Sequence, residues 1–530
     1  MDTVSIAPRR SLPAALRLDP AADATLFVAL RQAAALYRGG PGGIEDSNGA
    51  TSPQALLKRS VGAARIVTRL AGPGETVGIL LPNVAGTLAA VIGCSAAGRV
   101  PALLNYGAGA ETLDQACHAA TVRAIITSRA FVEKAGLATL VAALATPVHY
   151  LEDLREGLGP LDRLWIAVAL LAPALALPRG DREGPAVVLF TSGSEGVPKG
   201  VVLSHRALLA NIAQVLAALE LGPEHVVFNA LPVFHSFGLT AGALLPLLTG
   251  MRCVLYLSPL HYKQIPGLIR ESRATILFGT STFLRHYAEH AAPGDFASLR
   301  LVVAGAERLS DEVRERWQRD FGIDILEGYG CTETAPVLAV NLPGANRPGT
   351  VGRLLKGVDG RAVPVEGIAS GGSLQVRGPN VMSGYLRASA PGRLEPPATA
   401  LGAGWYDTGD IVDIDAEGYV RILGRARRFA KVAGELVSLA LSEELARHAR
   451  PAHQHAAART ADRERGERIV LFTTAADLQR HDLAQAAHQT GIRELAIPRR
   501  IVPLATLPVL GTGKTDHQTL AQMASALPED

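Results

Sequence analysis

The amino-acid pattern predicts an α/β fold built on doubly wound, mostly parallel sheets. Short apolar runs rich in β-branched residues alternate with stretches of helical periodicity through about the first 330 residues, which is typical of βαβ units. From about residue 345 to 424 glycine and proline become frequent and the apolar runs shorten, which indicates a small β-rich subdomain. Because a chain of 530 residues is too long for one core, we expect at least two domains.

The expected organisation has three parts. A loose tail comes first, a large N-terminal domain of doubly wound sheets carries the β-rich subdomain, and a small α+β C-terminal domain follows; these are residues 1–23, 24–424 and 425–530.

The alternation of strand and helix can be assigned segment by segment from periodicity. In the first part we expect strands at 76–81, 101–104 and 122–127, with helices at 84–97 and near 110–120. Further strands are expected at 186–190, 226–230, 252–257, 275–279, 300–304 and 323–326. In the C-terminal domain we expect helices at 440–449 and 477–489 and strands at 455–460, 468–473 and 499–504.

Charge and cysteine content exclude several classes of protein. The net charge is +3 without long basic runs, which argues against nucleic acid as the main partner. The four cysteines form no C-x-x-C pair, so we interpret them as buried, reduced thiols of an intracellular protein; they are Cys94, Cys117, Cys253 and Cys331. The first twenty residues lack the apolar core of a secretory signal. We therefore expect a cytoplasmic protein.

Two apolar stretches resemble membrane spans but are poor candidates. Residues 164–177 are too short and contain Pro173, and residues 237–257 are interrupted by Pro246, Gly250 and Arg252. We expect no transmembrane segment and interpret both stretches as core. For residues 164–177 a peripheral contact with a membrane surface, here the inner membrane, is the alternative.

The most informative stretch is Leu-Phe-Thr-Ser-Gly-Ser-Glu-Gly-Val-Pro-Lys-Gly at residues 189–200. It follows a predicted strand, and Ser204 behind it is a good N-cap for a helix with apolar residues on one face. Glycines let backbone N–H groups approach an anion, while hydroxyls and a lysine add donors and charge. We predict a triphosphate cradle from Thr191, Ser192, Gly193, Ser194, Glu195, Gly196, Lys199 and Gly200.

Two other interpretations of this stretch are weaker. A Walker A loop would need glycine where Pro198 stands, and Ser or Thr where Gly200 follows the lysine. A glycine-rich surface loop without a ligand is the remaining alternative.

Four more stretches complete a pattern that resembles the adenylate-forming enzymes: acyl-CoA synthetases, peptide-synthetase adenylation domains and beetle luciferases. They are Leu-Pro-Val-Phe-His-Ser-Phe-Gly at 231–238, Leu-Glu-Gly-Tyr-Gly-Cys-Thr-Glu at 326–333, Gly-Trp-Tyr-Asp-Thr-Gly-Asp at 404–410 with Gly424-Arg425, and Gly-Thr-Gly-Lys-Thr-Asp at 511–516. Within this group, the chain is most similar to the synthetase part of bacterial bifunctional acyl-carrier-protein synthetase/2-acylglycerophosphoethanolamine acyltransferase. That similarity rests on the sequences of residues 258–262, 278–283, 302–307 and 428–438. We expect this chain to lack the upstream acyltransferase domain of that protein.

The resemblance implies roles for residues on the larger domain. Thr332 would touch the α-phosphate, Glu333 would hold Mg²⁺, and His235 would form a mobile lid of the carboxylate pocket. The adenine pocket would be formed by Gly305, Ala306, Glu307, Tyr329 and Gly330. The acyl chain would lie along 236–243 and 279–284.

It also implies roles near and beyond the domain boundary. Lys514 would sit between the substrate carboxylate and the α-phosphate, two anions that repel each other by about 4 kcal/mol at 4 Å. Asp410 would accept the ribose hydroxyls, with Arg425 beside it. The small domain is expected to rotate between two half-reactions, with the hinge and the loop for thioester formation at Arg427, Lys431, Gly434 and Glu435. Each of these residues also has an ordinary structural interpretation when taken alone.

The implied reaction uses ATP and Mg²⁺ to convert a fatty acid to acyl-AMP with release of pyrophosphate. The acyl group then passes to the thiol of acyl carrier protein, for which Arg427, Arg428, Arg499 and Arg500 would form a basic docking patch. CoA as acceptor is one alternative, and acylation of 2-acylglycerophosphoethanolamine with a partner protein is another. A non-catalytic lipid- or nucleotide-binding relative is the alternative outside the enzymes.

Overall fold

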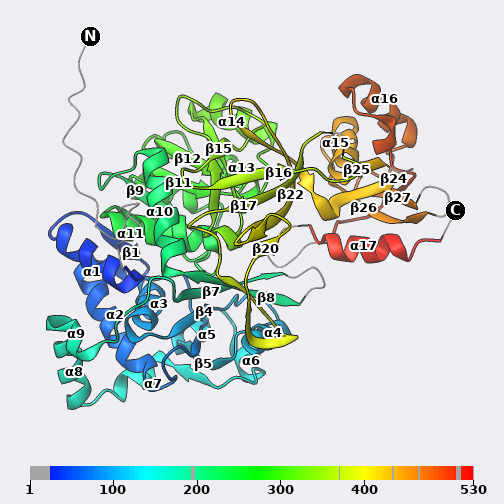
Figure 1. Cartoon of the computed structure of the whole chain (residues 1–530). Coiled ribbons are helices and arrows are strands. Elements are labelled where there is room, and N and C mark those ends of the chain that lie inside the picture. The colour runs from blue at the N-terminus through cyan, green and yellow to red at the C-terminus, as the bar shows by residue number, and fades with distance from the viewer. Residues whose placement is uncertain are drawn as a thin grey trace, which may run out of the picture. The chain divides into compact units, whose positions relative to one another are not determined.

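The computed structural model describes residues 24–192, 197–368, 370–432, 435–462, 466–508 and 515–528, and the predicted α/β fold class is confirmed (Figure 1). The chain divides into two compact units. The larger unit comprises Met1–Asp359 and Arg377–Gly404, and the smaller unit comprises Gly360–Val376 and Trp405–Asp530. The chain therefore passes between the units more than once, and the boundary at residue 424 stays a prediction.

One sheet of the larger unit carries the phosphate-loop hairpin. Its described strands run in the order β19 (Ala390–Glu395), β18 (Gly384–Arg387), β8 (Pro198–Ser204), β7 (Pro185–Ser192), β4 (Val100–Leu103), β3 (Thr76–Ile79), β5 (Val122–Thr127) and β6 (Val148–Tyr150). From β7 to β6 the pairing is parallel, whereas β7, β8, β18 and β19 pair antiparallel. The hairpin thus joins a parallel half to an antiparallel half.

The second sheet of the larger unit has the order β15 (Arg353–Leu354), β14 (Val337–Val340), β13 (Ile325–Gly330), β12 (Leu301–Ala304), β11 (Ile276–Gly279), β9 (Val226–Asn229), β10 (Arg252–Leu255), β1 (Gly43–Asp46) and β2 (Gly49–Thr51). Strands β13 to β1 are parallel. A short hairpin of β20 (Ala398–Thr399) and β21 (Gly402–Ala403) lies outside both sheets.

Helices cover these sheets and connect their strands. They are α1 (Leu26–Leu36), α2 (Pro53–Val67), α3 (Ala85–Ala97), α4 (Ala110–Ala119), α5 (Arg129–Lys134), α6 (Ala138–Ala142), α7 (Leu151–Glu156), α8 (Pro160–Leu171), α9 (Pro173–Ala176), α10 (His205–Leu219), α11 (Leu245–Thr249), α12 (Ile265–Ser272), α13 (Ser281–His290) and α14 (Asp311–Phe321), with a π-helix at Phe237–Leu244. Strand β3 is buried along its whole length, because a parallel sheet covered on both faces needs apolar residues throughout.

The smaller unit contains two sheets and three described α-helices. One sheet has the order β16 (Asp359–Val363), β17 (Gly372–Arg377), β22 (Tyr406–Ile414) and β23 (Val420–Arg425). The other has β25 (Glu435–Ser438), β24 (Phe429–Val432), β27 (Gly466–Thr473) and β26 (His455–Asp462), with β28 (Arg500–Pro503) parallel to β27. The helices are α15 (Leu439–Ala449), α16 (Arg480–Thr490) and α17 (His517–Ser525).

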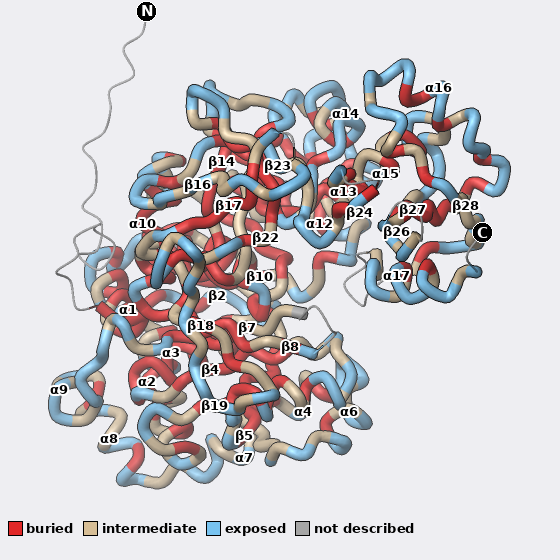
Figure 2. The backbone as a smooth tube through the Cα atoms, turned by 45° about the vertical axis from the view of Figure 1, so that its right-hand side comes forward, coloured by how far each residue is buried: buried red, intermediate tan, exposed pale blue. Residues whose placement is uncertain are grey.

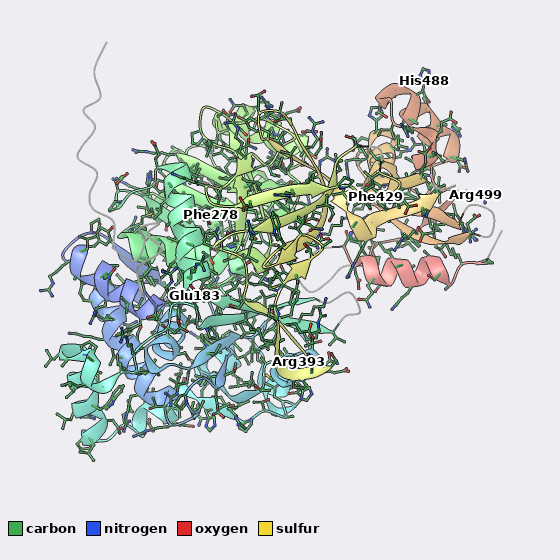
Figure 3. The ribbon with its side chains drawn as sticks, in the orientation of Figure 1. Glu183, Phe278, Arg393, Phe429, His488 and Arg499 are labelled. Atoms are coloured by element: carbon green, nitrogen blue, oxygen red, sulfur yellow. The ribbon has the colours of Figure 1, made fainter. Side chains whose placement is uncertain are left out.

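The strands and helices expected from the sequence are confirmed, with ends that differ by a few residues. Ser204 caps α10, since its Oγ accepts the Ala207 N–H at 3.1 Å. The stretch 237–257 is confirmed as core: its π-helix and α11 are buried. Figure 2 shows buried residues concentrated along the sheets of each unit, and Figure 3 labels Phe278 within the larger unit and Phe429 and Arg499 in the smaller one.

Two expectations are wrong. The stretch 164–177 is not core, since most of α8 and α9 is exposed or half-buried and Ala169 is its one buried residue. A buried acidic side chain occupies the inner face of α8 instead, which hydrophobicity alone does not reveal. Three of the cysteines are buried free thiols as expected, but Cys331 is half-buried, because it lies in the turn that follows the carboxyl end of β13. Within the described residues, no helix is long and apolar enough to cross a membrane.

Candidate active site

The ends of the predicted triphosphate loop form a regular β-hairpin. Thr191 on β7 pairs with Lys199 on β8, and Ser192 pairs with Pro198. Gly200 has a packing reason to be glycine, because a Cβ there would lie 3.0 Å from Val188 and 3.3 Å from Leu386. Gly193, Ser194, Glu195 and Gly196 lie outside the described residues.

A tight turn after β13 holds two of the predicted catalytic residues, Thr332 and Glu333. Thr332–Thr334 form one turn of 3₁₀-helix. Gly330 ahead of it cannot be replaced without moving the backbone, because a Cβ would lie 1.8 Å from the Pro336 carbonyl oxygen. The Glu333 side chain is buried within this turn.

A segment far along the chain supports this turn from behind. The Met382 N–H donates to the Glu333 carbonyl at 2.8 Å, and the buried Asn380 side chain donates to the Thr334 carbonyl at 2.8 Å. The turn is therefore fixed by main-chain and side-chain bonds from the β17–β18 connection, so the position of Glu333 is set by tertiary structure.

Tyr385 connects this turn to the phosphate hairpin. Its hydroxyl donates to Glu333 Oε1 at 2.7 Å, and the Lys199 Nζ lies 5.5 Å from the centre of its ring. A cation at this distance is attracted by the aromatic face. None of the sequence motifs includes Tyr385, which approaches Lys199 because β18 pairs with β8, with Tyr385 opposite Val201. No local sequence pattern reveals that pairing.

The predicted lid residue lies beside the same turn. His235 is exposed, and its ring centre is 4.7 Å from that of Phe234. The next residue, Ser236, approaches Thr332, with 3.4 Å between the two hydroxyl oxygens. The structure thus brings the 231–238 motif and the 326–333 motif together.

The residues predicted for the adenine pocket lie at the carboxyl ends of parallel strands. Gly305 and Ala306 follow β12, and Tyr329 is near the end of β13. Ligands of open α/β sheets bind at such strand ends. Ala306 has a φ of +64°, and Glu307 accepts the Thr282 N–H at 3.1 Å and its hydroxyl at 2.8 Å. Glu307 therefore stabilises the loop between β12 and α14.

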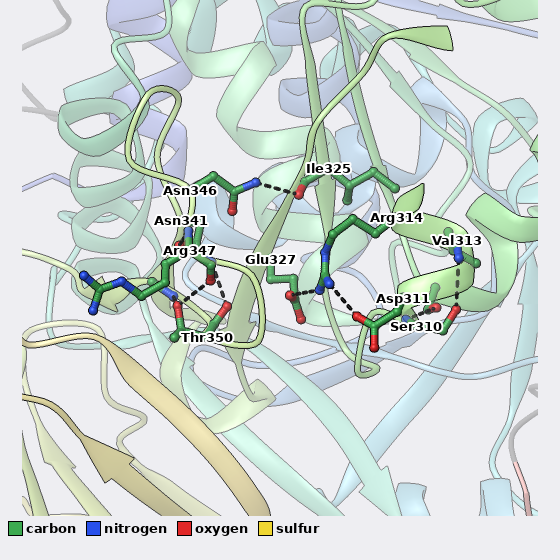
Figure 4. A network of polar contacts seen from close by, with 12 residues as sticks. Ser310, Asp311, Val313, Arg314, Ile325, Glu327, Asn341, Asn346, Arg347 and Thr350 are labelled. Carbon is green, nitrogen blue, oxygen red and sulfur yellow. Dashed lines mark hydrogen bonds and ion pairs between the residues drawn. The ribbon is translucent and has the colours of Figure 1, made fainter. Parts of the chain in front are cut away.

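A polar network around the buried Glu327 stabilises β13 just before Tyr329 (Figure 4). Glu327 accepts from Arg314 of α14 at 2.6 Å, and Arg314 also contacts Asp311 at 2.5 Å. Burial raises the pKa of Glu327, while the Arg314 charge and the N–H groups of Gly349 and Leu309 oppose that rise. The carboxylate thus holds together the strand, the helix and both neighbouring loops.

Side-chain amides stabilise the neighbouring loop at residues 341–350. Asn341 donates to the Thr350 carbonyl at 2.7 Å, and Asn346 donates to the Ile325 carbonyl at 3.2 Å. These bonds fix the 341–350 loop against β13.

The smaller unit brings together Asp410 and Arg425. They are opposite each other on β22 and β23, and Arg425 Nε lies 3.1 Å from Asp410 Oδ1. Asp410 is buried, as a side chain fixed to receive hydroxyl groups should be. Its role toward ribose stays a prediction.

The predicted hinge and loop residues lie further along this unit. Arg427 is exposed in the 3₁₀ turn Ala426–Arg428. Lys431 and Glu435 lie on the β24–β25 hairpin, where Arg493 contacts Glu435 at 3.1 Å. Gly434 and Lys514 lie outside the described residues.

The parallel sheets, the β7–β8 hairpin and the turn that holds Glu333 define a protein of the α/β class. Solved structures agree with this fold. ATP-bound MatB from Rhodopseudomonas palustris superimposes with a TM-score of 0.80 at 24% identity, covering 95% of this chain and 99% of that one. The o-succinylbenzoate CoA synthetase of Bacillus subtilis with its acyl-adenylate intermediate gives 0.78 at 21% identity, with 95% and 99% covered.

The family is established by sequence. Residues 45–386 match the model of the AMP-binding enzymes, and the chain belongs to that family. It is 29% identical to a long-chain-fatty-acid–CoA ligase of Salmonella typhimurium, over 85% of this chain and 86% of the relative. It is 31% identical to a feruloyl-CoA synthase of Amycolatopsis, over 72% and 75%. The chain is accordingly an ATP-dependent, AMP-forming acid–thiol ligase.

Proposed function

We propose that the acid is a fatty acid and that CoA is the thiol acceptor. The main structural support for this proposal is a series of contacts from Lys199 through Tyr385 to Glu333. These contacts link the β7–β8 hairpin to the turn that holds Glu333. The names of the relatives supply the substrate: long-chain and medium-chain fatty-acid–CoA ligases are among them.

In the first half-reaction a carboxylate oxygen attacks the α-phosphorus of ATP, and pyrophosphate leaves. Lys199 would contact the β- and γ-phosphates from the base of the hairpin. Lys514 would separate the attacking carboxylate from the α-phosphate, because two such anions at 4 Å repel by about 4 kcal/mol. In the second half-reaction the thiolate attacks the acyl carbonyl, and AMP leaves.

Mg²⁺ fits Glu333 as a protein ligand supplemented by phosphate oxygens. No group of three or more His, Cys, Asp or Glu side chains that could hold a metal occurs among the residues described here. Magnesium is commonly held by one or two carboxylates together with substrate phosphates, and there it neutralises the charge that develops on the leaving pyrophosphate. Tyr385 would keep Oε1 of Glu333 occupied and so orient the other carboxylate oxygen.

The carrier-protein acceptor is the second candidate, and the similarity to the acyl-carrier-protein synthetase motifs favours it. The proposed docking patch gives it less support. Arg428 contacts Glu443 at 2.5 Å and Arg499 contacts Asp462 at 2.8 Å, so both guanidinium groups already have acidic neighbours. Acylation of a lysophospholipid would in addition require a partner protein.

Pyrophosphate release with ATP, Mg²⁺ and a series of fatty acids tests this proposal, with either CoA or holo acyl carrier protein supplied. Turnover with CoA is expected. Turnover with carrier protein but not with CoA would show that acyl carrier protein is the thiol acceptor. Absence of turnover with every fatty acid would contradict the fatty-acid substrate.

A further inference from the structure

The α8–α9 segment of the larger unit buries a charged side chain and exposes apolar ones, the reverse of an ordinary surface helix. A surface helix normally turns its apolar face to the core and its polar face to water. In α8 the buried residues are Asp162 and Ala169, which lie on one face of the helix. Figures 1 and 2 both show α8 and α9 at the margin of the unit, and the colouring of Figure 2 shows most of their length exposed or half-buried.

Ionic contacts fix this orientation. Asp162 accepts from Arg65 Nε at 2.8 Å and also contacts Arg69; Arg65 is in the last turn of α2, and Arg69 follows the end of that helix. It accepts the Gly159 N–H at 2.8 Å as well. The Arg65 guanidinium lies 5.4 Å from the ring centre of Trp165, so the next side chain on this face is held too. Helix α8 cannot rotate its apolar face inward without breaking these contacts.

Three strongly exposed leucines lie on α8 and a fourth lies on α9. Leu161, Leu164, Leu171 and Leu175 are 79%, 61%, 87% and 81% exposed. We call these four residues the leucine stripe. Scattered exposed leucines need no explanation, but strongly exposed leucines concentrated in one short segment indicate an interaction surface.

Charge limits what can cover this stripe. Residues 164–178 contain no charged side chain, and the residues on either side of that run, Arg163 and Arg179, are both exposed arginines. Apolar side chains between basic ends are the pattern of a segment that lies in a membrane interface. The arginines are complementary in charge to anionic lipid headgroups.

We propose that the leucine stripe docks this protein on the surface of a lipid bilayer that contains anionic lipids. The segment cannot span the bilayer, because α8 ends at Leu171 and α9 begins at Pro173. A second copy of the chain is a poorer occupant, because the same break interrupts the stripe and a helical seam needs several heptads. If the proposed fatty-acid substrate is right, docking would place the enzyme where its acyl chains are dissolved.

Co-sedimentation of the full-length protein with phosphatidylcholine vesicles, with and without phosphatidylglycerol, tests the docking. Neither ATP nor fatty acid is added, so the result does not depend on the proposed reaction. Wild-type protein is expected to bind the vesicles that contain phosphatidylglycerol. The double variant Leu164→Gln/Leu171→Gln should lower the partition coefficient at least about tenfold. Arg163→Gln/Arg179→Gln should remove most of the preference for phosphatidylglycerol.

The matched control is Leu36→Gln/Leu394→Gln, which removes two leucines that are 43% and 41% exposed elsewhere on the larger unit. It should bind as wild type does, and circular dichroism should show the same melting for all variants. Absence of vesicle binding by wild type, or equal binding by the stripe variant, would overturn the proposal. So would a dimer that the stripe substitutions dissociate, or binding that appears only after removal of residues 1–23.

Discussion

Glu333 is held by two neighbours that are distant in the sequence. Its carbonyl accepts from Met382 and its side chain from Tyr385, and both come from the segment that leads into and forms β18. A carboxylate that must meet a metal ion benefits from such support, because a hydrogen bond to one oxygen fixes the direction of the other. The Tyr385 ring also approaches Lys199, so one side chain orients groups on both motifs.

Substituting Tyr385→Phe should raise the Mg²⁺ concentration that half-saturates ATP binding about tenfold, the effect of losing one hydrogen bond to a charged group. Titration calorimetry of ATP binding at varied Mg²⁺ measures this without turnover. Tyr287→Phe is the control, since it removes a buried hydroxyl that donates to the Pro259 carbonyl at 3.0 Å. It should lower stability and leave the Mg²⁺ dependence unchanged. An unchanged Mg²⁺ dependence in Tyr385→Phe would refute the orienting role.

Replacing Arg314 by Met should destabilise the protein by about 3 kcal/mol at pH 7, because it leaves the buried Glu327 carboxylate without its counter-charge. The sign of the pH dependence follows from the pKa of Glu327, which is raised by burial. A raised pKa in the folded state means that the folded protein favours the protonated carboxyl. The loss of stability in Arg314→Met should therefore shrink as pH falls toward about 4, where Glu327 becomes protonated and needs no counter-charge.

Urea unfolding of wild type and Arg314→Met at pH 7 and pH 5 measures that change. Arg319→Met is the control, because it removes an exposed ion pair to Asp320 from the same helix. A deficit that is the same at both pH values would show that Glu327 does not carry the effect.

At the scale of secondary-structure elements, the sequence predicted order and type well because the signals are local. Strands β3, β9, β11 and β12 are short apolar runs, and α10 has both its cap and its apolar face in the sequence. The reversed polarity of α8 was not predictable in this way. It depends on Arg65 and Arg69, which lie nearly a hundred residues before Asp162.

The contacts of Asp162 with Arg65 and Arg69 predict that the stability of α8 depends on pH. Hydrogen bonds from Arg65 lower the pKa of Asp162 to about 2, with help from Gly159 and Arg69. A carboxyl with a depressed folded pKa adds stability above its unfolded value, near 4, and this is lost as pH falls toward 2. Asp162→Asn should therefore loosen α8 at neutral pH, and the difference in unfolding midpoint between wild type and variant should vanish between about pH 4 and pH 2.

Limited trypsin digestion at neutral pH should show faster cleavage after Arg163 in Asp162→Asn. Asp153→Asn is the control, because it removes a carboxylate whose ion pair with Arg129 is exposed. Equal cleavage rates in wild type and Asp162→Asn would mean that the Arg65 contact does not hold the helix.

At the scale of the whole molecule, the five motifs predicted the family correctly because each carries several chemically specific residues in a fixed order. The structure brings three of them together in the larger unit, around Lys199, Ser236 and Glu333. Tyr385 was missed because its place depends on the register of β18 against β8, which no local pattern encodes. The carrier-protein acceptor predicted from sequence is less well supported than CoA, since the relatives reported above are named as CoA enzymes. The amino-acid sequences of the motifs do not determine which thiol accepts the acyl group.

Formation of an acyl adenylate is the central claim, and exchange of labelled pyrophosphate into ATP tests it most directly. The assay contains a fatty acid and Mg²⁺ but no thiol, so it isolates the first half-reaction. We expect exchange that depends on the fatty acid and falls at least about a hundredfold in Glu333→Gln, in the range lost when one transition-state contact is removed. Exchange that is absent with every fatty acid, or that Glu333→Gln leaves unchanged, would contradict the account.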